Sequence, residues 1–147
     1  MPNSSVEAFL SPQEEQEVVE AILTAENNTS GEIRVHIEPT ASVDHFERAQ
    51  EVFHLLKMDN TKDANGVLLY VAVNDRKFVI FGDKGINDVV SDTFWDDTKE
   101  VIQQHFKDGN FKQGIVEGVL KAGEELNAHF PWKSNDTNEL SNEVSKG

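Results

Sequence analysis

The chain has 147 residues, no cysteine, and a formal net charge of −14 from 27 acidic and 13 basic residues. This length supports one domain with a sizeable core, and the missing cysteine excludes disulfides and thiolate metal sites. The negative charge argues against nucleic acid or an anionic membrane surface as a partner, because both would be repelled.

No stretch approaches the roughly 18 consecutive apolar residues that a membrane-spanning helix needs. The first residues also lack the basic start and the apolar run of a secretory signal. We therefore expect a cytoplasmic, monomeric protein that does not insert into a membrane.

The first helix is predicted to begin at Ser11, which can act as a cap before Pro12 and has Glu14 three residues later. Its apolar face consists of Val18, Val19, Ile22, Leu23 and Ala25. Alternation of apolar and polar residues over Glu32–Glu38 then predicts a strand with one face toward the core. A second helix is predicted to start at Ser42 and to run to about residue 56.

Two apolar runs, residues 67–73 and 78–81, are separated by Asn74-Asp75-Arg76-Lys77, which predicts a β-hairpin. Strand, helix and strand in succession form a right-handed crossover, so the strand at 32–38 should lie parallel to the strand at 67–73. The run 67–73 is almost wholly apolar, as expected of a central strand covered on both faces.

Two more helices are predicted, over residues 91–106 and 111–129. The element order predicts an α/β fold, a three-layer α/β/α sandwich in which helices flank a small mixed β-sheet. The composition divides the chain into a flexible N-terminus at 1–8, one domain at 9–130, and a polar tail at 131–147 that we expect to be disordered.

Acidic and amide side chains gather at the two outer ends of the predicted hairpin. An antiparallel pair brings these ends together, and Ca²⁺ takes six to eight oxygen ligands from such groups. The predicted metal ligands are Asp63, Asn65, Asp83, Asn87, Asp88 and Asp92. The alternative is that these residues serve only as helix caps and turn formers.

Several short motifs occur in an order and spacing that resemble one known family. They are Thr29-Ser30-Gly31-Glu32-Ile33-Arg34-Val35, Asp63-Ala64-Asn65-Gly66-Val67-Leu68-Leu69, Asn74-Asp75-Arg76, Gly82-Asp83-Lys84-Gly85-Ile86-Asn87 with Asp92, and the set Phe106, Gly109, Phe111 and Gly114. Over residues 9–130 the chain resembles the TPM domain, which occurs in thylakoid-lumen photosystem-maintenance proteins and in many bacterial envelope proteins.

The resemblance implies a compact α/β/α sandwich and a divalent-metal site, usually for calcium, in an acidic pocket at the end of the sheet. Some plant members are described as weak acid phosphatases, and other members act in membrane-protein repair or complex assembly. We expect this chain to be a stand-alone TPM domain that binds a divalent cation, with calcium as the expected ion. It would serve as a metal-binding or interaction module. The alternatives are a weak metal-dependent acid phosphatase that uses the same pocket, with no catalytic residue assigned, and a protein-interaction domain without metal.

Overall fold

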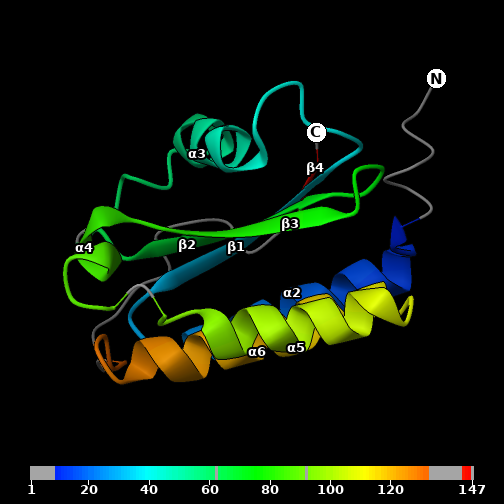
Figure 1. Cartoon of the computed structure of the whole chain (residues 1–147). Coiled ribbons are helices and arrows are strands. Elements are labelled where there is room, and N and C mark those ends of the chain that lie inside the picture. Colours follow the sequence, from blue (N-terminus) through cyan, green and yellow to red (C-terminus); the bar gives the residue numbers. More distant parts are fainter. Residues whose placement is uncertain (1–8, 62, 92, 133–143, 147) are drawn as a thin grey trace.

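The computed structural model describes residues 9–61, 63–91, 93–132 and 144–146. Its helices are α2 (Pro12–Glu26), α3 (His45–Leu55), α4 (Lys84–Asn87), α5 (Asp96–Lys107) and α6 (Phe111–Asn127), and its strands are β1 (Glu32–Glu38), β2 (Gly66–Ala72), β3 (Lys77–Gly82) and β4 (Ser145–Lys146). The four strands form one sheet in the order β3-β2-β1-β4. Helices α2, α5 and α6 cover one face of it and α3 covers the other (Figure 1). The predicted three-layer α/β/α sandwich with a mixed sheet is confirmed.

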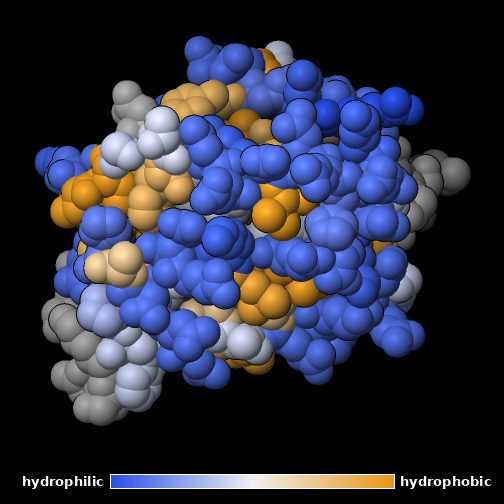
Figure 2. Space-filling view, turned by 60° about the horizontal axis from the view of Figure 1, so that its bottom comes forward, coloured by the Kyte–Doolittle hydropathy of each residue, from blue (hydrophilic) through white to orange (hydrophobic). Residues whose placement is uncertain are grey.

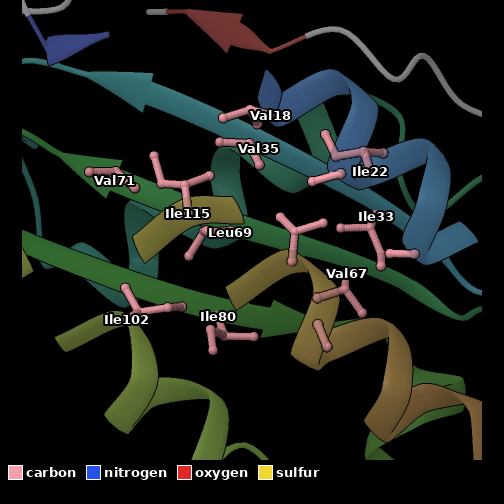
Figure 3. Close-up of a cluster of buried hydrophobic side chains, with 14 of the residues drawn as sticks. Val18, Ile22, Ile33, Val35, Val67, Leu69, Val71, Ile80, Ile102 and Ile115 are labelled. Carbon is pink, nitrogen blue, oxygen red and sulfur yellow. The ribbon is translucent and has the colours of Figure 1, made fainter. Parts of the chain in front are cut away.

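Strand β2 lies at the centre of the molecule, and all seven of its residues are buried. It pairs in parallel with β1 and antiparallel with β3, so the predicted crossover and hairpin are both confirmed. Its alternate side chains belong to two separate cores. Val67, Leu69 and Val71 pack toward α2, α5 and α6 (Figure 3), whereas Leu68, Tyr70 and Ala72 pack with α3.

Strand β1 differs from the prediction that only one of its faces is buried. Ile33, Val35 and Ile37 are buried in the larger core as expected. The polar face is also covered, because Glu38 and His36 are only 3% and 5% exposed. These side chains lie on the face that α3 covers, where they form the polar network described below.

The observed start of α2, which a capping box defines, agrees with the start predicted from the sequence. At α2, Ser11 Oγ accepts a hydrogen bond from the backbone of Glu14, and the Glu14 side chain accepts one from the backbone of Ser11. Helix α3 is capped by Asp44 and not by Ser42, because the Asp44 side chain accepts from the two N–H groups that follow it in the first turn. Helix α5 begins at Asp96 instead of residue 91, and the short helix α4, which was not predicted, precedes it.

The C-terminal residues also differ in part from the sequence prediction. Ser145 and Lys146, within the tail expected to be disordered, form β4 and pair in parallel with His36 and Ile37 of β1. Nearer the domain, Pro131 forms an isolated bridge with Thr29. Residues 1–8, predicted to be flexible, and residues 133–143 and 147 of the predicted tail lie outside the described residues.

Helix α6 packs close to its neighbours through small residues. A Cβ atom on Gly118 would lie 2.5 Å from Cγ1 of Ile102 in α5, and one on Gly123 would lie 2.8 Å from Cβ of Ala25 in α2. The outer surface of this helix layer is mostly hydrophilic (Figure 2). Among the described residues, no helix combines the length and hydropathy that crossing a bilayer would require.

One polar group in the larger core offers a test of this packing. Thr98 of α5 is buried among apolar residues, and its Oγ1 has no hydrogen-bond partner among the described residues. Because an unpaired buried hydroxyl is costly, we expect Thr98→Val to raise the free energy of unfolding by about 1 kcal/mol in urea denaturation. The control is Thr24→Val on the exposed side of α2, which should change it by less than about 0.5 kcal/mol. A destabilised Thr98→Val protein would show that the hydroxyl is satisfied in solution.

Candidate functional site

The segments before β2 and after β3 meet at one end of the sheet. The Asp83 N–H donates to the Gly66 carbonyl at 2.9 Å, and the Gly85 N–H donates to the Ala64 carbonyl at 2.8 Å. The sequence predicted that the two outer ends of the hairpin lie together, and these backbone contacts confirm it. We call residues 63–66 and 82–88 the sheet-end loops.

Two residues make the close contact between the sheet-end loops possible. A Cβ atom on Gly85 would lie 2.3 Å from the carbonyl oxygen of Asp63 and 2.5 Å from that of Ala64, so only glycine fits. Ala64 itself has a φ of 50°, in the left-handed region that non-glycine residues rarely adopt. Strained backbone of this kind persists only where the surrounding contacts fix it.

Two predicted ligands carry buried oxygens without a hydrogen-bond donor among the described residues. Asn65 is only 1% exposed, and its Nδ2 donates to Ser30 Oγ at 3.4 Å while its Oδ1 has no partner. Asp83 uses Oδ1 to cap α4, accepting from the Lys84 N–H at 2.7 Å, and its buried Oδ2 has no partner. Both atoms are acceptors, and a bound cation satisfies buried acceptors of this kind.

The other predicted ligands lie in the same loops but toward solvent. Asp63, Asn87 and Asp88 are exposed. Asn87 donates from Nδ2 to the Gly82 carbonyl at 3.1 Å, and Asp88 ends α4. Asp92 lies outside the described residues. Within the described part of the chain, no three His, Cys, Asp or Glu side chains are grouped closely enough to hold a metal ion, so any cation there would rely on amide and backbone oxygens as well.

The cap-and-turn alternative is therefore observed for some of the same residues. Asp83 is the N-cap of α4 through Oδ1, and Asp88 is its C-cap. Capping leaves the second oxygen of Asp83 and the amide oxygen of Asn65 unexplained. The sheet-end loops thus combine a structural role with two acceptors that local capping does not use.

A second polar cluster, which the sequence did not predict, lies on the α3 face of β1. Glu38 accepts from Arg48 at 2.9 Å on Oε2 and 3.0 Å on Oε1, and it also accepts from the Tyr70 hydroxyl. His36 Nε2 lies 3.1 Å from Glu38 Oε1, and His36 Nδ1 lies 3.0 Å from Ser145 Oγ. The residues come from β1, α3, β2 and β4, so no local motif in the sequence connects them.

The charge states in this network follow from its hydrogen bonds. Burial acts to raise the pKa of Glu38, but hydrogen bonds from Arg48, Tyr70 and His36 outweigh it and lower that pKa to about 2. Burial lowers the pKa of His36, which makes its neutral form the relevant one near pH 7. Because an ionised Glu38 can only accept, Nε2 of His36 carries the proton and Nδ1 accepts from the Ser145 hydroxyl.

A pair of carboxyl groups lies where α2 leads into β1. Glu26 Oε2 accepts from the Ile33 N–H at 2.8 Å. Burial, with a smaller contribution from the neighbouring Glu32, raises the pKa of Glu26 to about 8 against the opposing Ile33 hydrogen bond. Glu32 in turn donates from its backbone N–H to the Asn65 carbonyl at 3.3 Å, so the pair adjoins the sheet-end loops.

Asp75, at the opposite end of the hairpin, has a structural role beyond the predicted turn. It accepts from Thr40 Oγ1 at 2.7 Å, from the Ala41 N–H at 3.0 Å and from His45 Nε2 at 2.9 Å. These contacts, the Thr40 bond first, lower the pKa of Asp75 to about 2. They fasten the hairpin turn to the segment that begins α3.

Comparison with known proteins identifies the class of protein that this fold and these loops define. A sequence model of the TPM domain matches residues 5–125. The solution structure of the BA42 protein from the psychrophilic bacterium Bizionia argentinensis superposes with a TM-score of 0.92 at 62% identity, covering 98% of this chain and 99% of the other. The chain belongs to the TPM domain family.

More distant structures share the fold. The N-terminal domain of a protein from P. gingivalis has a TM-score of 0.67 at 22% identity, covering 83% of this chain and 79% of that one. The N-terminal domain of the cg2496 protein from Corynebacterium glutamicum has a TM-score of 0.62 at 12% identity, covering 94% and 80%. No curated protein matches the chain.

The contact at Gly85 provides a test of how the sheet-end loops are held. We expect Gly85→Ala to lower the free energy of unfolding by about 1–3 kcal/mol, because the new methyl group meets backbone oxygens that cannot rotate away. The matched control is Gly82→Ala, whose Cβ would make ordinary contacts of 3.5 Å or more. Urea denaturation of both variants measures the difference, and equal stability of the two would contradict the inferred close contact.

The Glu26 carboxyl group predicts a pH dependence of stability. The folded protein keeps the Glu26 proton up to about pH 8, whereas the unfolded chain loses it near 4.5, so the free energy of unfolding should fall as the pH rises between these values. Glu26→Gln keeps an acceptor for the Ile33 N–H and removes the charge. We expect the free energy of unfolding of Glu26→Gln, measured relative to that of wild type, to increase by about 2 kcal/mol from pH 5 to pH 8.

The measurement is urea denaturation of both proteins at the two pH values. Glu20→Gln, at an exposed position of the same helix, should shift the unfolding midpoint equally at both. A Glu26→Gln protein whose stability parallels that of wild type across this range would show that Glu26 is already ionised at pH 5.

Proposed function

We propose that this TPM domain binds a divalent cation, with calcium as the preferred ion, at the sheet-end loops. The observation that carries the proposal is the pair of buried acceptors without donors among the described residues, Asn65 Oδ1 and Asp83 Oδ2. Each would be unfavourable in a protein without a cation, because a desolvated oxygen lacks the partner that water would provide.

The donor chemistry of the loops suits calcium better than a transition metal. The candidate ligands are carboxylate, amide and backbone oxygens, which are the hard ligands that calcium prefers, and the chain has no cysteine. Asn65 and Asp83 would provide the inner oxygens. Asp63, Asn87 and Asp88 would complete the set from the exposed side, together with Asp92, which lies outside the described residues.

A bound cation would join the sheet-end loops electrostatically, in addition to the two backbone hydrogen bonds already present. It would also offset part of the net charge of −14, which opposes compact folding through self-repulsion. The function that follows is that of a metal-binding module whose loop surface is ordered by the ion and can then contact a protein partner.

A metal-dependent acid phosphatase would use the same loops, with the cation polarising a phosphoryl oxygen. Its support is the family resemblance. Hydrolysis of p-nitrophenyl phosphate, assayed with calcium and with a chelator, separates it from the non-catalytic module. Turnover that requires the cation and is lost in Asp83→Asn would favour the enzyme, and cation binding without turnover would favour the module.

The central test is a calcium titration of the full chain followed by amide NMR shifts. We expect saturable shifts in residues 63–66 and 82–88. Asp83→Asn should weaken the affinity by about tenfold or more, because it removes a ligand charge while an amide oxygen can still cap α4.

The matched control is Asp44→Asn, which makes the same charge change at the N-cap of α3. It should leave calcium affinity within about twofold of wild type, since Asp44 lies at the start of α3, which contacts the hairpin turn at the opposite end of the hairpin from the sheet-end loops. Spectra that stay unchanged up to millimolar calcium, or equal losses in the two variants, would refute the proposed site and leave the cap-and-turn role.

A further inference from the structure

Among the described residues, strand β4 pairs with only part of the outer edge of the sheet. It consists of Ser145 and Lys146, which pair with His36 and Ile37, whereas β1 has seven residues. In the described part of the chain, regular strand pairing on this edge is limited to those residues (Figure 1). An edge that already accepts a parallel strand has the backbone geometry to accept a longer one.

The side chains around β4 define three consecutive subsites along the edge. Val144 packs against the larger core, Ser145 Oγ lies 3.0 Å from His36 Nδ1, and Lys146 Nζ lies 2.8 Å from Glu15 Oε2. As expected of an extended chain, the first and third side chains lie on the α2 side of the sheet and the second on the α3 side. The three subsites therefore favour, in chain order, an aliphatic residue, a residue with a hydroxyl group and a basic residue.

The middle subsite is held in place independently of β4. The His36 ring is stacked on Tyr70 with centroids 5.9 Å apart, and its Nε2 is fixed by Glu38. Glu38 is in turn fixed by Arg48 on two oxygens. The ring nitrogen that faces the edge is thus preorganised by residues of β1, β2 and α3, and it needs no rearrangement to accept a hydroxyl.

We propose that the β1 edge is a docking site for an extended segment of a partner protein, which binds parallel to β1 in exchange for β4. The segment carries the order aliphatic–Ser/Thr–Lys/Arg, read by the core, by His36 and by Glu15. A basic partner segment also matches the charge of −14 on this chain. Strand addition of this kind takes affinity from main-chain hydrogen bonds and specificity from alternate side chains. The proposal does not depend on the cation site.

The test is fluorescence anisotropy of a labelled peptide containing Val-Ser-Lys, titrated with the full chain. Ser145→Pro releases the resident strand, because proline cannot donate to the ladder. Removing this internal competitor should tighten peptide binding by about tenfold. In amide NMR spectra of the same samples, the peptide should shift Val35, His36 and Ile37. Equal peptide affinity for wild type and Ser145→Pro, or no saturable binding to either, would overturn the proposal.

A charge exchange tests the direction and register of the bound segment. Glu15→Lys should weaken binding of the Val-Ser-Lys peptide by about tenfold, and a Val-Ser-Glu peptide should recover the affinity for that variant. Glu17→Lys, on the same helix and paired with Lys112 instead, is the matched control and should leave the affinity unchanged. Failure of the Val-Ser-Glu peptide to recover binding would exclude the assigned register.

Concentration-dependent dimers of wild type that are lost in Ser145→Pro would assign the edge to a second copy of the chain. That result would overturn the proposal of a separate partner protein.

Discussion

The fold depends on the complete burial of β2. A strand with both faces in apolar surroundings needs a strand on each side to satisfy its backbone and a helical layer on each face to exclude water. Strands β1 and β3 are these neighbouring strands, and they pair with β2 in parallel and antiparallel register, respectively. One face is covered by the layer of α2, α5 and α6, and the other face is covered by α3. Because the side chains of β2 alternate between two cores, a shift of one residue would exchange their environments, so the register is strongly fixed.

The burial of β2 also places the sheet-end loops. Once β2 is held between β1 and β3, the residues before it and the residues after β3 must meet at one end of the sheet. Glycine at position 85 then lets the two backbones come closer than any side chain would permit. Ala64 accepts a left-handed conformation in the same place. Among the described residues, one of the three non-glycine positions with a positive φ therefore lies beside the candidate ligands.

Features encoded by local chemistry were predictable from the sequence. The cap at Ser11, the hairpin and the parallel crossover each follow from short-range patterns and chain connectivity, and the structure contains all three. The start of α5 was misplaced because acidic residues from position 88 onward look like a first helical turn, whereas residues 88–90 and 93–95 form turns and bends between α4 and α5. Strand β4 could not be predicted, since two residues carry no periodicity.

The candidate site was predictable to the level of loops but not of atoms. Hairpin geometry alone predicts that residues near 63 and 83 meet. Which oxygens turn inward depends on side-chain rotations and on neighbours from other elements, such as Ser30 beside Asn65. The buried acceptors belong to Asn65 and Asp83, while Asp63, Asn87 and Asp88 face solvent. Sequence patterns cannot make that distinction, because the buried and the exposed residues are both drawn from aspartate and asparagine.

The position of β1 beside the sheet edge explains how it can carry three buried polar side chains, Glu32, His36 and Glu38. Groups that wrap around the edge can reach the polar side chains of β1, whereas β2 is apolar apart from the Tyr70 hydroxyl, which donates to Glu38 of β1. Glu26 reaches the Ile33 N–H from α2, and Ser145 reaches His36 from the C-terminal segment. Arg48 of α3 donates to Glu38, which also contacts His36. Strand β1 thus supplies specific hydrogen-bonding positions at the edge, while β2 and its two cores supply the apolar burial that stabilises them.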